Sequence, residues 1–172
     1  MKYFAYGSNM SLARLRERAP GAQRLGSYAL RGHVLCFHKV GTDGSGKCDA
    51  FFTKDANDLV LGALFELDAS EKIHLDQVEG LGLGYEQKEV LLEDEIGRQV
   101  KASIYYATDI DASLKPYSWY KKHVLLGAIE SALPDAYIER ISVTESVQDP
   151  DGKRDKQQRA IHDSFSKGPY SK

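Results

Sequence analysis

Short stretches in which apolar and polar residues alternate dominate the first two thirds of the chain. Such alternation is typical of half-buried β-strands, and turn-forming residues separate the stretches. We predict strands over residues 3–6, 27–39, 47–53, 59–67, 85–93 and 99–107. After Pro116 the apolar residues recur at helical spacing as far as Pro134, and Pro134 is suited to begin a further helix through Ile141.

Two shorter helices are expected among the strands. One is predicted over residues 11–18, with Asn9 or Ser11 as its N-cap. The other should begin after Asp68, because Asp68 and Glu71 have the spacing of a capping box. The order of elements predicts an α+β fold, a small and mostly antiparallel β-barrel with flanking helices.

Composition and charge narrow the classes of protein. The chain has 172 residues, 42% of them hydrophobic, and a net charge of -2. We expect one domain over 1–148 and a polar helix or tail over 149–172. No apolar run approaches the roughly 20 residues of a membrane span, and the start lacks the features of a signal peptide. These features predict a cytoplasmic protein without a membrane or nucleic-acid partner, with Cys36 and Cys48 as reduced, buried thiols.

The common motifs for metals and nucleotides are absent from the sequence. It contains no Gly-x-x-x-x-Gly-Lys-Ser/Thr, His-Glu-x-x-His or Cys-x-x-Cys, and its five histidines lack metal-ligand spacing. The glycine-rich run over residues 80–84 follows a predicted helix and not a strand, so it is interpreted as a tight connection. We therefore expect neither a metal nor a cofactor.

The turn Gly7-Ser8-Asn9 is the first candidate for chemistry. It lies between a predicted strand and a predicted helix, where backbone N–H groups lack regular partners. Such N–H groups can bind an anion, and Gly7 lets the backbone approach a ligand closely. A plain turn with a helix cap remains the alternative interpretation of this pattern.

Glu79 is the second candidate. It lies at the C-terminal end of a predicted helix, three residues after Asp76 and among Val78, Leu81 and Leu83. The helix end, the nearby acid and the apolar neighbours would all favour a neutral carboxyl, which suits a general base near pH 7. A solvated surface glutamate is the alternative. Because an acid at a helix C-terminus beside Asp76 is unfavourable, replacing Glu79 by glutamine should leave the stability of the fold unchanged or slightly higher.

Three tyrosines could line a pocket with hydroxyl groups, or could simply pack in the core. They are Tyr85, Tyr117 and Tyr120.

Several segments together resemble the γ-glutamylcyclotransferase-like family. Residues 3–10 resemble its Tyr-Gly-Ser-Asn motif, and residues 75–80 resemble the segment that carries its catalytic glutamate. Gly84-Tyr85 follows at the expected distance, and residues 116–134 resemble a downstream segment of the enzymes acting on γ-glutamyl amino acids. The resemblance covers roughly residues 2–140. The segment Cys48-Asp49-Ala50-Phe51 departs from the small-residue strand of the family, which affects the shape of the pocket.

The resemblance implies an enzyme of γ-glutamyl and glutathione metabolism that needs no cofactor. The α-amine of the substrate attacks its own γ-glutamyl carbonyl, releasing 5-oxoproline and an amino acid or an amine. Glu79 would be the catalytic acid/base. The substrate-binding residues implied are Tyr6, Gly7, Ser8, Asn9, Tyr85 and Tyr120. A homodimer is compatible with this reading, and a non-catalytic small-ligand-binding module on the same fold is the alternative.

Overall fold

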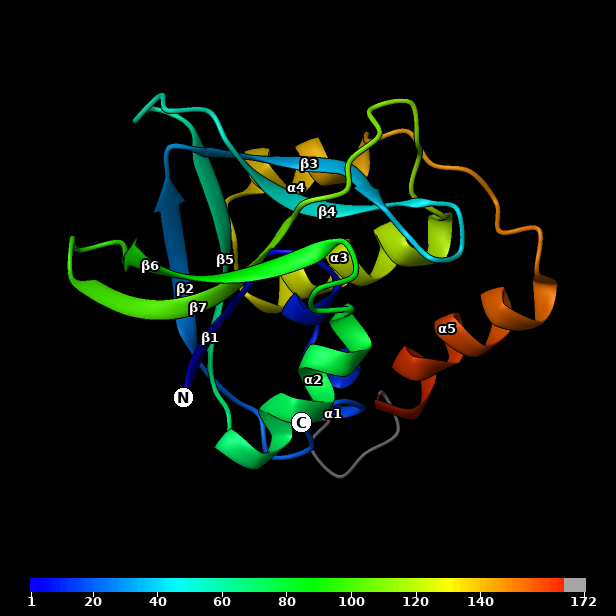
Figure 1. Ribbon diagram of the computed structural model, residues 1–172, viewed down its shortest axis with the longest axis horizontal. Coiled ribbons are helices and arrows are strands. Elements are labelled where there is room, and N and C mark those ends of the chain that lie inside the picture. The colour runs from blue at the N-terminus through cyan, green and yellow to red at the C-terminus, as the bar shows by residue number, and fades with distance from the viewer. Residues whose placement is uncertain (166–172) are drawn as a thin grey trace.

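A computed structural model of the chain describes residues 1–165 and shows strands packed beside a group of helices (Figure 1). The strands are β1 (Lys2–Ala5), β2 (Gln23–Arg31), β3 (His33–Val40), β4 (Gly46–Phe52), β5 (Leu59–Glu66), β6 (Tyr85–Glu93) and β7 (Gln99–Ala107). The helices are the 3-10 turn η1 (Ser8–Met10), α1 (Leu12–Arg16), α2 (Ala69–Glu79), α3 (Ser118–Glu130), α4 (Asp135–Ser142) and α5 (Gly152–Phe165).

Five of the strands close into a barrel in the order β1-β5-β2-β6-β7. Its pairs are antiparallel except at the closure, where β1 runs parallel to β7 with Tyr3 opposite Ser103. Strands β3 and β4 form a separate two-stranded sheet. The predicted α+β class with a small barrel and flanking helices is confirmed, and the barrel is mixed.

The prediction of a single strand over residues 27–39 is wrong. The structure has two strands there, and Gly32 separates β2 from β3 with a φ of 72°. Left-handed backbone of this kind favours glycine and breaks the regular pleat. This break lets β2 stay in the barrel while β3 leaves it to pair with β4.

The N-terminal capping of helices α1 and α2 agrees only in part with the prediction. Helix α1 is shorter than expected, and Ser11 stands at its N-cap position without a side-chain capping bond. Asp68 does cap α2, accepting a hydrogen bond from the Ser70 N–H at 2.8 Å. The reciprocal half of the capping box is not formed, because the Glu71 carboxylate instead accepts from the Gly21 N–H at 2.6 Å.

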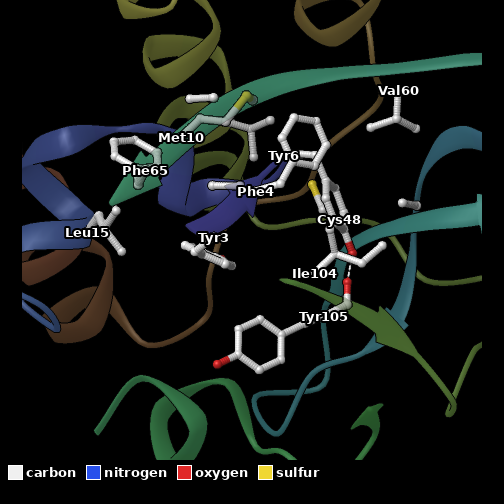
Figure 2. Packing of buried hydrophobic residues seen from close by; sticks show 14 of the residues in the cluster. Tyr3, Phe4, Tyr6, Met10, Leu15, Cys48, Val60, Phe65, Ile104 and Tyr105 are labelled. Atoms are coloured by element: carbon white, nitrogen blue, oxygen red, sulfur yellow. Dashed lines mark hydrogen bonds between the residues drawn. The ribbon is translucent and has the colours of Figure 1, made fainter. Parts of the chain in front are cut away.

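The core fills the barrel and continues under the helices (Figure 2). Phe4, Phe65 and Ile104 are fully buried inside the barrel strands, and Met10 and Leu15 extend the core below the N-terminal turn. The core therefore fixes the segment that follows β1 directly against the barrel.

The C-terminal region ends in α5, which packs on α1 and α3 (Figure 1). Arg14 on α1 donates to Gln158 on α5 at 2.5 Å, and Arg159 donates to Ser118 on α3 at 2.7 Å. Residues 166–172 of the predicted tail lie outside the described residues. Within residues 1–165, no helix is long and apolar enough to span a membrane.

Candidate active site

The topology brings several chain segments together at one end of the barrel. Because β1 and β7 run parallel, their carboxyl ends meet at this end, beside the start of the antiparallel β6. The turn after β1, the last residue of α2, and residues of β4 and α3 border the same pocket. Its lining residues are Tyr3, Tyr6, Gly7, Ser8, Asn9, Cys48, Glu79, Tyr85, Tyr105 and Tyr120.

The pocket includes all but one of the residues that the sequence analysis named for the site. Glu79, the Gly7-Ser8-Asn9 turn, Tyr6, Tyr85 and Tyr120 all line it. Tyr117 does not; its hydroxyl donates to the Asp43 carbonyl at 3.0 Å instead. The free space is about 30 Å³, close to the volume of one water molecule in the liquid.

The turn after β1 presents unbonded backbone donors to this pocket. The N–H groups of Gly7, Ser8 and Asn9 make no hydrogen bond to any of residues 1–165. At Gly7, a Cβ atom would stand 2.9 Å from the Cβ of Cys48 and 3.4 Å from the hydroxyl of Tyr120. Glycine is therefore required by the pocket wall itself, and not only by the approach of a ligand.

Glu79 is held by a ring of polar contacts. Its Oε1 accepts from Arg18 Nη1 at 2.7 Å and from Asn9 Nδ2 at 2.9 Å, and Arg18 Nη1 also donates to Asn9 Oδ1 at 2.6 Å. Asn9 is thus not the N-cap that the sequence suggested. The Oε2 atom of Glu79 makes no hydrogen bond within residues 1–165, so one oxygen is anchored and the other is available.

The surroundings expected for Glu79 differ from those observed. Val78 and Leu83 are exposed, so they do not enclose the carboxylate in apolar contacts. Asp76 is engaged elsewhere, accepting from Lys72 at 2.5 and 2.6 Å and from the Tyr105 hydroxyl at 2.5 Å. The partner of Glu79 is instead Arg18, with which it forms an ion pair.

The tyrosine hydroxyls are fixed mainly by the backbone. Tyr6 donates to the Tyr105 carbonyl at 2.5 Å (Figure 2), and Tyr85 donates to the Cys48 carbonyl at 2.5 Å. The Cys48 N–H donates to the Tyr120 hydroxyl oxygen at 3.0 Å. Burial raises the pKa of Tyr6, Tyr85 and Tyr120 well above the ordinary value, so all three stay neutral near pH 7.

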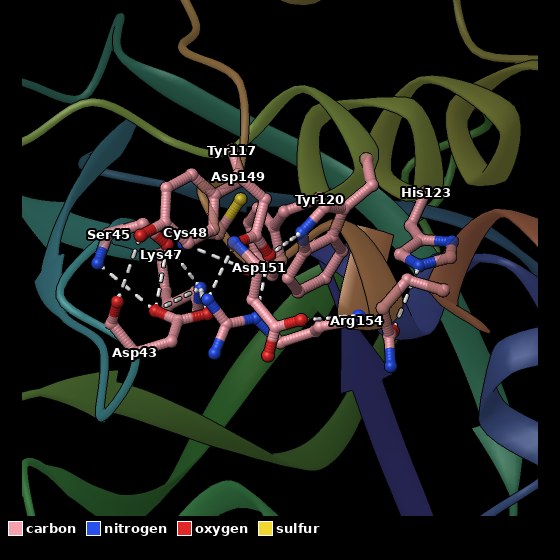
Figure 3. A network of polar contacts seen from close by, with 12 residues as sticks. Asp43, Ser45, Lys47, Cys48, Tyr117, Tyr120, His123, Asp149, Asp151 and Arg154 are labelled. Atoms are coloured by element: carbon pink, nitrogen blue, oxygen red, sulfur yellow. Dashed lines mark hydrogen bonds and ion pairs between the residues drawn. The ribbon is translucent and has the colours of Figure 1, made fainter. Parts of the chain in front are cut away.

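Behind the Cys48 wall lies a charged network (Figure 3). The ammonium of Lys47 pairs with Asp43 at 2.7 Å and lies 4.9 Å from the Tyr120 ring centroid. Asp149 accepts from Arg154 at 2.6 Å and from the Trp119 indole at 2.7 Å. Since these charges are paired with one another, they support the wall without facing the pocket as free groups.

Sequence reasoning missed Arg18, Tyr3 and Tyr105, and it connected Cys48 with the pocket only through its departure from the family pattern. The local sequence did not indicate a basic partner for Glu79, because the last turn of α2 contains no basic residue. Nothing in the local pattern distinguishes Arg18 from the other lysines and arginines, 23 in all. Only the tertiary structure, which places the turn after α1 next to the last residue of α2, identifies it.

Two further features concern other possible sites within residues 1–165. No group of three or more potential metal ligands occurs within residues 1–165. A larger groove of about 600 Å³ lies along β2 and the β6–β7 turn, bordered by Tyr28, Glu93 and Pro134 among others. Its acid Glu93 is paired with Arg31 through both carboxylate oxygens, whereas Glu79 is paired through Oε1 alone, so the smaller pocket is the candidate for chemistry.

The comparisons with known proteins agree on one group of relatives. Residues 59–141 match the model of the AIG2-like family. The curated "Gamma-glutamylcyclotransferase" of Homo sapiens is 30% identical over 171 residues, covering 96% of this chain and 88% of that protein. The protein of the same name from Bos taurus is 29% identical over the same shares.

Solved structures show the same similarity in three dimensions. A structure titled "Gamma-glutamyl cyclotransferase" superposes with a TM-score of 0.84 at 28% identity, covering 98% of this chain and 99% of that chain. A human protein titled as uncharacterized gives a TM-score of 0.83 at 28% identity, over 96% of this chain and 98% of that chain. The similarity therefore extends over the barrel and the helices together.

Proposed function

The chain belongs to the γ-glutamylcyclotransferase family and is an enzyme of that kind, and we propose that it converts γ-glutamyl amino acids to 5-oxoproline. The observation that carries the proposal is that Arg18 and Asn9 anchor Glu79 Oε1, while Oε2 and three N–H groups of the adjacent turn make no hydrogen bond to residues 1–165. An acid and an anion cradle in one pocket are the two parts that intramolecular aminolysis needs.

The proposed reaction uses only groups of the substrate and the chain. The α-amine attacks the γ-carbonyl carbon, forming the ring C–N bond as the bond to the leaving nitrogen breaks. Glu79 Oε2 accepts the proton of the attacking amine and returns it to the leaving nitrogen. Because the nucleophile is tethered to the carbonyl, holding the curled conformation provides much of the acceleration.

The turn is proposed to hold the γ-glutamyl group. The N–H groups of Gly7, Ser8 and Asn9 can donate to its α-carboxylate or to the oxyanion that forms on the γ-carbonyl. The pocket holds only about 30 Å³ in its present form, so the side chains around it must shift when the substrate binds. The exposed end of the pocket near Glu79 is then occupied by the leaving group.

The test is the release of 5-oxoproline, detected by mass spectrometry. γ-Glutamyl-alanine and the γ-glutamyl-lysine isopeptide should be compared, since they separate an amino-acid from an amine leaving group. N-acetyl-γ-glutamyl-alanine is the matched control, because it lacks the attacking amine and must stay intact. An enzyme that releases alanine from the acetylated compound is a hydrolase, and the proposed reaction is then wrong.

A further inference from the structure

Lys39, the last residue but one of strand β3, is a buried basic residue beside the pocket. Only 5% of its surface is exposed, and its Nζ lies 4.7 Å from the ring centroid of Tyr85, a lining residue. Gly84 lies on its other side, with a φ of 105°, and a Cβ atom there would stand 3.2 Å from Nζ. The glycine connection after α2 thus makes room for an ammonium next to the pocket.

This ammonium lacks a hydrogen-bonding partner in the described part of the chain. Lys39 Nζ makes no hydrogen bond or ion pair with any of residues 1–165, whereas the neighbouring Lys47 is paired with Asp43. Burial lowers the pKa of Lys39, and the charge of Glu79 acts in the opposite direction, ahead of Asp109 and Asp43. Most of the Lys39 side chain is buried, but its Nζ is not a fully enclosed atom, so a carboxylate can approach the ammonium and pair with its charge.

We propose that Lys39 binds the α-carboxylate of the leaving amino acid and thereby selects γ-glutamyl amino acids over γ-glutamyl amines. The inference rests on the proposed function, because it takes Glu79 as the group next to the leaving nitrogen. In an amino acid the carboxylate carbon is only two bonds from that nitrogen. The substrate therefore carries its second negative charge close to Glu79, where a cation is needed.

The other cations around the pocket already have partners. Arg18 is paired with Glu79 and Asn9, and Lys47 with Asp43. Arg14 donates to Gln158 on α5. The Nε atom of Arg14 also lacks a partner within residues 1–165, but that guanidinium lies over the Trp119 ring, whereas the whole ammonium of Lys39 lies beside Tyr85 without a hydrogen bond.

The experiment compares Lys39→Met with the wild type on two substrates. γ-Glutamyl-alanine carries the carboxylate, and γ-glutamyl-ethylamide lacks it while keeping the same scissile bond. Loss of a charge-assisted hydrogen bond should raise KM for γ-glutamyl-alanine by about 10- to 100-fold. For the ethylamide, kcat/KM should stay within about threefold of the wild-type value, which also shows that the variant is folded.

Lys88→Met is the matched control, because Lys88 also lies over aromatic rings but contacts His33 and does not line the pocket. This control variant should leave KM and kcat unchanged for both substrates. If Lys39→Met slows both substrates equally, Lys39 acts through Glu79 or through packing, and the inference is wrong. If it changes neither, Lys39 does not bind the carboxylate, and the inference is equally wrong.

A binding measurement separates this inference from the proposed function. Calorimetry with γ-glutamyl-alanine on the Glu79→Gln background should show binding that Lys39→Met weakens by the same factor, without turnover. Binding that depends on Lys39 in an enzyme that releases no 5-oxoproline would refute the proposed function and retain the lysine site. Absence of both binding and turnover in the wild type would refute both.

Discussion

Replacement of Glu79 by glutamine tests the centre of the proposed mechanism. Glutamine has nearly the same shape, and its carbonyl oxygen can still accept from Arg18 and Asn9 as Glu79 Oε1 does. It cannot accept a proton from the attacking amine. The substitution therefore removes the proposed chemistry while it preserves most of the geometry.

The expected loss of activity follows from the general-base contribution. Such groups contribute about 10²- to 10⁴-fold, so kcat should fall by roughly 10³, which corresponds to about 4 kcal/mol in the barrier. The affinity for 5-oxoproline should change little, because the proposed cradle consists of backbone N–H groups.

The structure also changes the expectation for stability. The sequence suggested that losing an acid at a helix C-terminus would be neutral or favourable. Glu79 is instead ion-paired with Arg18, and both side chains are about 15% exposed (15% and 16%). A hydrogen bond to a charged group contributes about 1 kcal/mol more than a neutral one. The variant should therefore lose about 1 kcal/mol, or about 2–4 °C in Tm for a chain of this size.

Two measurements test these expectations for Glu79→Gln. Release of 5-oxoproline from saturating γ-glutamyl-alanine gives kcat, and thermal unfolding gives Tm. Glu89→Gln is the control, because Glu89 makes an exposed ion pair with Lys101 away from the pocket, and it should change neither value. If Glu79→Gln keeps more than about a tenth of kcat, Glu79 is not the base, and Asp76 and Glu86 are the next carboxylates to test. A higher Tm would refute the argument from the ion pair.

Three further predictions concern other parts of the molecule. Gly7→Val should abolish binding of 5-oxoproline in calorimetry, because a Cβ at 2.9 Å from the Cys48 Cβ forces the pocket wall apart; unchanged affinity would contradict the close-packed turn. Activity should survive EDTA and iodoacetamide, since Cys48 is buried and burial raises the pKa of its thiol; inactivation reversed by zinc would point to a metal mechanism. His123 is buried against Trp119 and His162, and burial lowers its pKa from 6.5 to about 2. The unfolded chain therefore takes up this proton first, and the free energy of unfolding should fall by up to about 1.4 kcal/mol per pH unit as the pH drops below 6.5, which lowers Tm. His123→Gln should flatten that slope between roughly pH 6.5 and 5, and an identical slope would show that other groups cause it.

The sequence by itself determined the elements whose signals are local. Strands β6 and β7 begin and end at their predicted residues, because alternation and the turn over residues 94–97 act between near neighbours. The end of α2 at Gly80 is equally local, since its φ of 73° suits glycine. The position of Glu79 at that helix end, and its inclusion in a pocket with the Gly7 turn, also followed from the sequence through the family resemblance.

The tertiary structure alone decided which groups surround that acid. Its sequence neighbours Val78 and Leu83 suggested an apolar setting, yet both point to solvent, and the partner is Arg18, 61 positions away. Lys39 likewise comes to lie beside Tyr85 and Gly84 through tertiary structure, because β3 leaves the barrel after the break at Gly32. Local preferences select backbone conformations. Which charged side chains meet in a pocket depends on long-range packing, and from the sequence alone many lysines and arginines are equally suitable partners for Glu79.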